Sequence, residues 1–120
     1  AVWGAAFKPG TDRVDHAPAL RIVAALLAQG VEVRVHDPQA LPQLRAAIGP
    51  SPALVESGAW EALDGADALL VLTEWREYWS PDFARMRAAM RTPLLLDGRN
   101  IYDPAWVRAQ GFAYYGVGRR

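Results

Sequence analysis

Short apolar runs alternate with amphipathic segments along the whole chain. Residues 1–6 are largely apolar, residues 31–36 alternate strictly between apolar and polar side chains, and residues 68–72 form a continuous apolar run. Strict alternation predicts a strand with one wetter face, and a short continuous run predicts a central parallel strand buried on both faces. Two more strands are predicted over 93–96 and 112–117.

Helix signals fill the intervals between these strands. Pro18 can occupy a first helical position, and an apolar stripe follows it up to Gly30. Further helices are predicted over 39–48, over 60–63, from Ser80 as N-cap to about Arg91, and from Pro104 to Gln110. Strands separated by helices of this length indicate right-handed crossovers. We therefore predict one α/β domain over residues 1–120, doubly wound, with a mostly parallel Rossmann-like sheet and helices on both faces.

Composition excludes several classes of protein. The 120 residues include 13 basic and 13 acidic side chains, and 52% of them are hydrophobic. A net charge of zero argues against a nucleic-acid partner, because such proteins carry a basic excess on one face. The chain has no cysteine, so it contains no disulfide, no thiolate metal site and no cysteine nucleophile.

The sequence also bears on location and extent. No apolar run approaches the roughly 18 residues of a membrane span, and nothing resembles a signal peptide, so we expect a cytoplasmic protein without a membrane partner. The chain begins with Ala1 directly inside a predicted strand, and without a methionine. That start favours a piece of a longer protein.

Two cationic loops follow predicted strands. Lys8 lies in Phe-Lys-Pro-Gly after the first strand, and Arg99 lies in Asp-Gly-Arg-Asn after the strand at 93–96. Because ligands bind at the carboxyl edge of open α/β sheets, both side chains are expected at that edge. Lysine supplies a point charge and arginine a planar fork, which together suit a phosphate-bearing ligand. The loops therefore predict nucleotide binding, with no catalytic residue and no metal site in the chain.

Other nucleotide and catalytic sites are less well supported. The loop from Gly4 to Gly10 lacks the second and third glycines of a dinucleotide-binding fingerprint, so Asp37 is expected to form a turn before Pro38 rather than bind a ribose. A phosphoacceptor receiver domain needs acidic residues after the first strand and a lysine after the fifth, and here those charges are reversed. No serine stands in a nucleophile elbow, and the two histidines lack metal-ligand spacing. His36 is expected to point outward from its strand.

Several side chains near the two loops have both a structural and a functional interpretation. Arg99 either binds phosphate or pairs with Asp97 or Asp103, and Asp97 is expected to order its loop. Thr11 and Asp12 either shape the first loop or contact the ligand.

The segment after residue 72 is ambiguous in the same way. Trp75 and Trp79 either pack under the loop or border the ligand, and packing is the commoner role for large aromatic side chains. Glu74 and Glu77 form a pair of carboxylates for which a solvated loop is the favoured interpretation.

Taken together, these motifs resemble a known family. Phe-Lys-Pro-Gly-Thr-Asp, Thr-Glu-Trp and Asp-Gly-Arg-Asn, in that order, resemble the C-terminal UDP-binding domain of the UDP-glucose/GDP-mannose dehydrogenase family. The resemblance runs over essentially the whole chain, through residues 4–12, 18–20, 36–38, 65–68, 73–75, 97–100 and 116–118.

The resemblance implies part of an NAD-dependent oxidoreductase that oxidises the C6 alcohol of a UDP-sugar to a carboxylate. NAD would be bound mainly by an N-terminal domain outside this chain, and a central region would form a homodimer. The family's catalytic cysteine also lies upstream. By resemblance, Phe7, Lys8 and Arg99 contact the UDP-sugar. Residues implied to support the loops or the site are Thr11, Asp12, Thr73, Glu74, Trp75, Asp97, Gly98 and Asn100.

One position departs from the family pattern. The family usually continues with Asp-x-Arg-Glu-Ser, whose arginine reaches toward NAD, whereas this chain has Asp15 at that place. Either a neighbouring cation such as Arg13 substitutes, or the member handles its cofactor differently, or its activity is reduced. The second hypothesis is therefore a non-catalytic UDP-binding module of an inactive or divergent member. The third is a generic structural or oligomerisation domain, against which the two cationic loops count.

Overall fold

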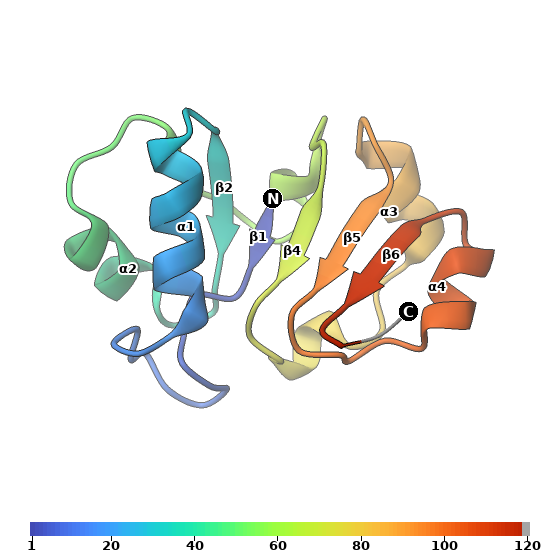
Figure 1. Cartoon of the computed structure of the whole chain (residues 1–120), viewed down its shortest axis with the longest axis horizontal. Helices are drawn as coiled ribbons and strands as arrows, with labels where there is room; N and C mark the ends of the chain where they lie inside the picture. Colours follow the sequence, from blue (N-terminus) through green and yellow to red (C-terminus); the bar gives the residue numbers. More distant parts are fainter. Residues whose placement is uncertain (119–120) are drawn as a thin grey trace.

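A six-stranded parallel sheet forms the centre of the computed structural model, which describes residues 1–118 (Figure 1). The strands lie in the order β3-β2-β1-β4-β5-β6, and each neighbouring pair runs parallel. This arrangement confirms the predicted doubly wound α/β fold. The strands are Val2–Trp3 (β1), Val33–His36 (β2), Leu54–Glu56 (β3), Leu69–Val71 (β4), Leu94–Asp97 (β5) and Ala113–Gly116 (β6).

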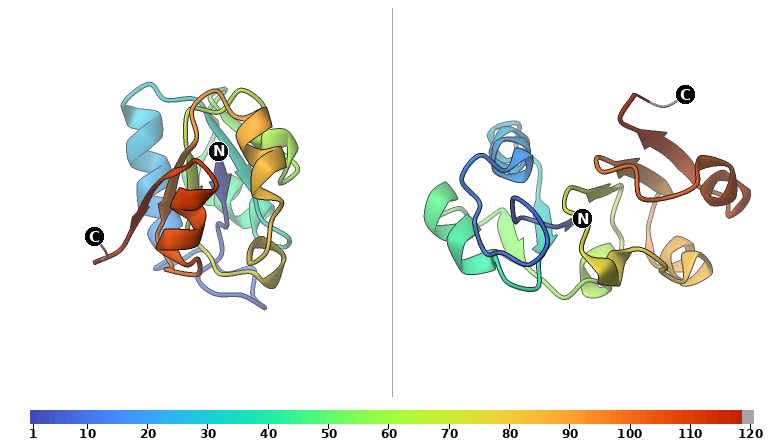
Figure 2. Two further views of the ribbon diagram at one scale, coloured as in Figure 1. Left: turned by 90° about the vertical axis from the view of Figure 1, so that its right-hand side faces the viewer. Right: turned by 90° about the horizontal axis from the view of Figure 1, so that it is seen from below.

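Helices cover the sheet from both sides (Figure 2). The α-helices are Pro18–Ala28 (α1), Leu41–Ile48 (α2), Phe83–Ala89 (α3) and Pro104–Ala109 (α4), and the 3-10 helices are Glu61–Leu63 (η1) and Arg76–Tyr78 (η2). The first two α-helices lie on one face, and the other four helices lie on the opposite face. Each face has its own core, so that Val2 packs in one cluster and its neighbour Trp3 in the other.

The order of the strands places a switch point between β1 and β4. From β1 the chain winds outward through β2 to β3, and from β4 it winds the other way through β5 to β6. The strands point downward in Figure 1, and the right-hand view of Figure 2 looks onto their carboxyl ends. In such sheets the loops that diverge at the switch point leave a crevice for a ligand.

The first strand is shorter than predicted. It ends at Trp3 because Gly4 has φ +101°, a conformation that side chains rarely adopt, and its N–H donates to the carbonyl of His36. A Cβ at Gly4 would also lie 2.5 Å from the backbone nitrogen of Thr73. The chain therefore turns away from the sheet three residues early, and Ala5 and Ala6 belong to the loop.

Other elements also differ from the prediction. The helix expected from Ser80 begins instead at Phe83, because the carboxylate of Asp82 caps it by accepting from the N–H of Arg85 at 3.1 Å. It ends at Ala89, because Met90 is already extended. The edge strand β3 was not predicted at all, since three residues carry too little periodicity to be recognised.

Candidate functional site

The loop after β1 presents the first predicted cation. The N–H of Phe7 donates to the carbonyl of Arg13 at 2.7 Å, which closes the loop on itself. Lys8 is exposed, and its side chain makes no hydrogen bond or ion pair within residues 1–118. The ring of Phe7 is 47% exposed. The loop therefore exposes an apolar ring and an ammonium group on adjacent residues.

A buried carboxylate at the end of β2 fixes the base of this loop. Asp37 is 4% exposed, and its Oδ2 accepts from the N–H groups of Ala5 at 2.8 Å and Ala6 at 3.0 Å. The same oxygen accepts from Nε1 of Trp75 at 2.9 Å. Its Oδ1 accepts from the N–H groups of residues 39 and 40 at the start of α2, both at 2.8 Å. Asp37 thus joins three segments and forms the turn before α2.

His36 does not point outward as predicted. Its Nδ1 lies 2.7 Å from the hydroxyl of Tyr78, whose ring stacks on Trp3 with the centroids 4.9 Å apart. Burial, together with the charge of Asp37, raises the pKa of Tyr78, so its hydroxyl stays protonated. These rings pack η2 against the end of β2, and they support residues 73–75, which precede η2.

The Thr-Glu-Trp segment after β4 connects three other strand ends. Thr73 donates its hydroxyl to the carbonyl of Ala6 at 2.7 Å, and Trp75 reaches Asp37 as described. Glu74 accepts from Nε of Arg99 at 2.6 Å. The expectation of a solvated carboxylate was therefore wrong for Glu74. Three consecutive side chains tie β4 to the ends of β1, β2 and β5.

The second cation stands on an ordered loop after β5. Asp97 is almost fully buried, and its oxygens accept from the N–H of Arg99 at 3.1 Å, from the N–H groups of Ile101 and Tyr102, and from the hydroxyl of Tyr114 at 2.8 Å. This carboxylate orders the loop, which is the role expected of it. The Arg99 guanidinium pairs with Glu74, and not with Asp97 or Asp103, the two partners considered from the sequence.

The residues on either side of Arg99 complete the loop. Gly98 donates its N–H to the carbonyl of Val71 at 2.8 Å, and a Cβ there would lie 3.1 Å from that oxygen. Asn100 has φ +55°, and its side chain donates to the carbonyl and accepts from the N–H of Val117, both at 2.8 Å. The backbone that carries Arg99 is thus fixed to β4 and to the end of β6.

The remaining predicted residues lie farther along the β1 loop. Thr11 accepts from the N–H of Arg13 at 3.2 Å, and Asp12 accepts from the side chain of Gln43 at 2.9 Å. Asp15 receives two hydrogen bonds from the guanidinium of Arg13, the shorter at 2.6 Å, and these lower the pKa of its carboxyl group. Both side chains of this ion pair are exposed, so it contributes little to stability.

The topology places the two cationic loops on either side of β4. Strands β1 and β5 are both neighbours of β4, so their axes lie about 10 Å apart at the carboxyl edge. Lys8 and Arg99 therefore lie on loops at the same edge of the sheet, on the two sides of the segment that follows β4.

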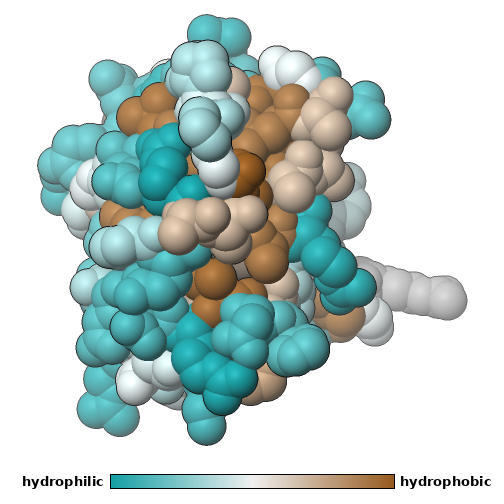
Figure 3. Space-filling model, turned by 90° about the vertical axis from the view of Figure 1, so that its left-hand side faces the viewer, coloured by the Kyte–Doolittle hydropathy of each residue, from teal (hydrophilic) through white to brown (hydrophobic). Residues whose placement is uncertain are grey.

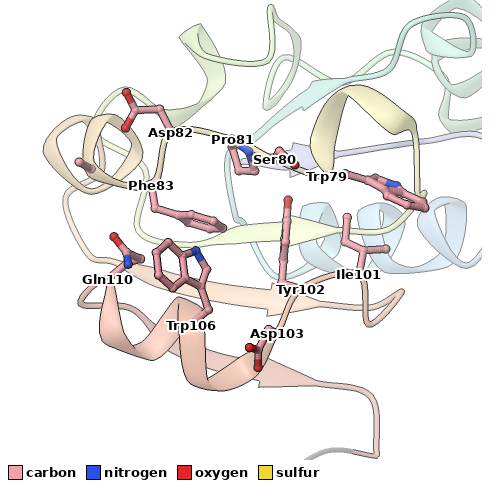
Figure 4. A pocket seen from close by; sticks show the side chains of 11 residues that line it. Trp79, Ser80, Pro81, Asp82, Phe83, Ile101, Tyr102, Asp103, Trp106 and Gln110 are labelled. Carbon is pink, nitrogen blue, oxygen red and sulfur yellow. The ribbon is translucent and has the colours of Figure 1, made fainter.

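The surface hollows between the helices lie away from these loops. One, of about 440 Å³, lies between η2, α3 and α4, where the rings of Phe83, Tyr102 and Trp106 gather (Figure 4). The other lies between α1 and α2 and is lined by Leu20, Leu27 and other apolar residues, on the face whose apolar band is visible in Figure 3. Neither is lined by Phe7, Lys8 or Arg99.

Comparison with known proteins identifies the family. Residues 1–104 match the model of the UDP-binding domain of the UDP-glucose/GDP-mannose dehydrogenase family. The chain belongs to this family. It is 47% identical over 123 residues to a UDP-glucose 6-dehydrogenase of Pseudomonas aeruginosa, and 40% identical over 119 residues to that of Rhizobium meliloti. Both matches cover 99% of the chain but only 27% of the relative. The chain thus spans about a quarter of their length.

Solved structures agree with this assignment. A UDP-glucose dehydrogenase of Pyrobaculum islandicum superposes with a TM-score of 0.78 at 29% identity, over 99% of this chain and 25% of that one. An NDP-N-acetyl-D-galactosaminuronic acid dehydrogenase of Methanosarcina mazei superposes with a TM-score of 0.80 at 29% identity, over 100% of this chain and 24% of that one. Among residues 1–118, no helix is both long and apolar enough to cross a membrane.

Proposed function

We propose that this chain is the nucleotide-sugar-binding domain of an NAD-dependent UDP-glucose 6-dehydrogenase-like enzyme. The observation that carries the proposal is the pair of cationic loops at the carboxyl ends of β1 and β5, in a member of a UDP-binding domain family. Lys8 and Arg99 would bind the diphosphate, and Phe7 would contact the nucleotide beside Lys8. The enzyme as a whole would oxidise the sugar C6 alcohol to a carboxylate.

In this proposal the chain binds and orients its substrate and does not carry out the oxidation. Binding energy from the UDP group, which does not react, would place C6 next to reactive groups elsewhere in the enzyme. The chain has no cysteine, so a covalent step through a thiol requires residues outside it. We therefore predict that the chain alone produces no NADH from UDP-glucose and NAD⁺.

The residues after β1 do not fit a dinucleotide cofactor. Both carboxylate oxygens of Asp37, at the position where Rossmann domains bind a ribose, are occupied by hydrogen bonds from the chain itself. The glycines that let a pyrophosphate approach the backbone are also missing. We therefore place NAD on an upstream domain, and propose with it a central dimerisation region and a cytoplasmic homodimer.

Binding of UDP by the isolated 120-residue chain tests the proposed function. We expect millimolar UDP to raise its melting temperature, because a ligand that binds only the folded state stabilises it. Differential scanning fluorimetry with uridine as the matched control would measure the shift. A folded chain whose melting temperature does not change up to tens of millimolar UDP would contradict the assignment.

Asp15 bears on the alternative, a non-catalytic UDP-binding module. We propose that Asp15 lies near the cofactor and repels its pyrophosphate, although Arg13 neutralises part of its charge. In the full-length protein the Michaelis constant for NAD⁺ should then fall from wild type to Asp15→Ala to Asp15→Arg. Asp15→Ala already frees the Arg13 guanidinium, so part of the decrease in the Michaelis constant should be seen in that variant. If all three proteins have the same Michaelis constant for NAD⁺, Asp15 lies away from the cofactor. The reason for considering a non-catalytic module is then removed.

A further inference from the structure

Glu74 is an unexpected component of a site proposed to bind an anion. Its carboxylate lies 2.6 Å from Nε of Arg99, and its side chain is 23% exposed against 38% for that of Arg99. A carboxylate normally competes with phosphate for a guanidinium, so Glu74 either weakens the site or has a specific role in it. The geometry of the contact distinguishes these two roles.

The contact uses only one of the three guanidinium nitrogens. Glu74 accepts from Nε, and neither Nη nitrogen of Arg99 donates to a protein oxygen within the described residues. The edge formed by the two Nη groups therefore remains available for a bidentate contact with phosphate oxygens. A competing carboxylate would be expected to occupy that edge itself.

Glu74 is in turn fixed by its neighbours. Its backbone carbonyl accepts from Nε1 of Trp79 at 3.1 Å, and the side chains before and after it bind Ala6 and Asp37. The backbone under Arg99 is equally fixed, through Asp97. An arginine side chain has several rotatable bonds, and ordering them on binding lowers affinity. A partner that orders them beforehand removes part of that loss.

We propose that Glu74 is a positioning residue, which fixes Arg99 through Nε and leaves both Nη nitrogens for the diphosphate. The inference rests on the proposed function, because it assigns Glu74 an effect that acts only through Arg99. It explains the glutamate of the Thr-Glu-Trp segment as a part of the nucleotide site that does not touch the nucleotide.

Calorimetric titration of the 120-residue chain with UDP tests this role. Glu74→Ala should weaken UDP binding about threefold to tenfold, which lies in the lower part of the range for coupled neighbours. Glu74→Gln should lose less UDP affinity than Glu74→Ala, because the amide oxygen of glutamine can still accept a hydrogen bond from Nε of Arg99. Combined with Arg99→Ala, Glu74→Ala should have no further effect. Binding of uridine, which lacks phosphate, should not respond to either substitution. Glu77→Gln, an exposed carboxylate three residues away, is the matched control and should bind UDP like wild type.

The outcomes separate the inference from the proposed function. If Arg99→Ala itself leaves UDP affinity unchanged, the proposed function is wrong and the inference falls with it. If Arg99→Ala weakens binding while Glu74→Ala strengthens it, Glu74 is a competing anion and the inference alone is overturned. The inference alone is also overturned if Glu74→Ala lowers the melting temperature but leaves UDP affinity unchanged, because the Glu74–Arg99 ion pair is then only structural.

Discussion

Replacing either Lys8 or Arg99 by alanine should weaken UDP binding at least about tenfold and leave the fold nearly intact. A hydrogen bond to a charged group contributes roughly 1.5–3 kcal/mol, which corresponds to about one to two orders of magnitude in affinity. Lys8 is exposed and makes no polar contact within residues 1–118, so its removal should not change the free energy of unfolding measurably. Titration with UDP and thermal unfolding of each variant measure the two effects.

Arg91→Ala is the matched control for these two variants. Arg91 is an exposed arginine that pairs with Asp67 at 3.5 Å, and it precedes β5, whereas Arg99 follows that strand. Removing it changes the net charge by the same amount, so it should reproduce any long-range electrostatic effect but not the loss of a direct contact. If Arg91→Ala weakens UDP binding as much as Arg99→Ala, the site is not at the carboxyl edge. An Arg99→Ala protein that melts earlier but binds UDP normally would make Arg99 a structural residue.

The sequence was sufficient to predict the fold and the edge of the sheet that carries the candidate site. The apolar runs located five of the six strands, and the strand–helix alternation implied parallel connections. Parallel strands bring their carboxyl ends together whatever the details of the loops. Lys8 and Arg99 could therefore be assigned to one edge without knowledge of any contact.

The contacts that build the site could not be predicted in the same way. Glu74 and Arg99 are 25 residues apart, and Asp37 and Trp75 are 38 residues apart, so no local pattern connects them. The sequence showed that Arg99 would have carboxylates nearby, but those on its own loop were the nearest in the chain. Asp97 is instead saturated by backbone N–H groups and a tyrosine hydroxyl, which leaves Glu74 to pair with Arg99.

Asp37 shows a second kind of contact that could not be predicted from the sequence. An Asp-Pro at the end of a strand indicates a turn, and that interpretation was correct for the two N–H groups at the start of α2. Nothing local announced the three other donors, which come from the β1 loop and from Trp75. These donors come close to Asp37 only when the strands pair and their loops meet, and no local sequence pattern indicates such long-range contacts.

Asp37→Asn should therefore be the most destabilising of the substitutions considered for this chain. The carboxylate accepts five hydrogen bonds and donates none, with donors facing both of its oxygens. An asparagine must turn its NH₂ group toward one of the two sets, so at least two N–H donors, one of them fully buried, lose their acceptor. Each such loss costs about 1–3 kcal/mol, and we expect a total of roughly 3–5 kcal/mol.

Urea unfolding of the 120-residue chain would measure this loss, beside two comparison variants. Asp67→Asn, at an exposed carboxylate, should unfold like wild type. Trp75→Phe removes the Nε1 donor to Asp37 together with one ring of an indole that packs against both cores, and should cost about 1–3 kcal/mol, so it stays measurable even if Asp37→Asn fails to fold. Trp75→Phe should also weaken UDP binding slightly, because it loosens the link between the β4 segment and the carboxylate that fixes the Lys8 loop. An Asp37→Asn protein within about 0.5 kcal/mol of wild type would show that the five contacts do not act as a unit, and that the loop is fixed by other means.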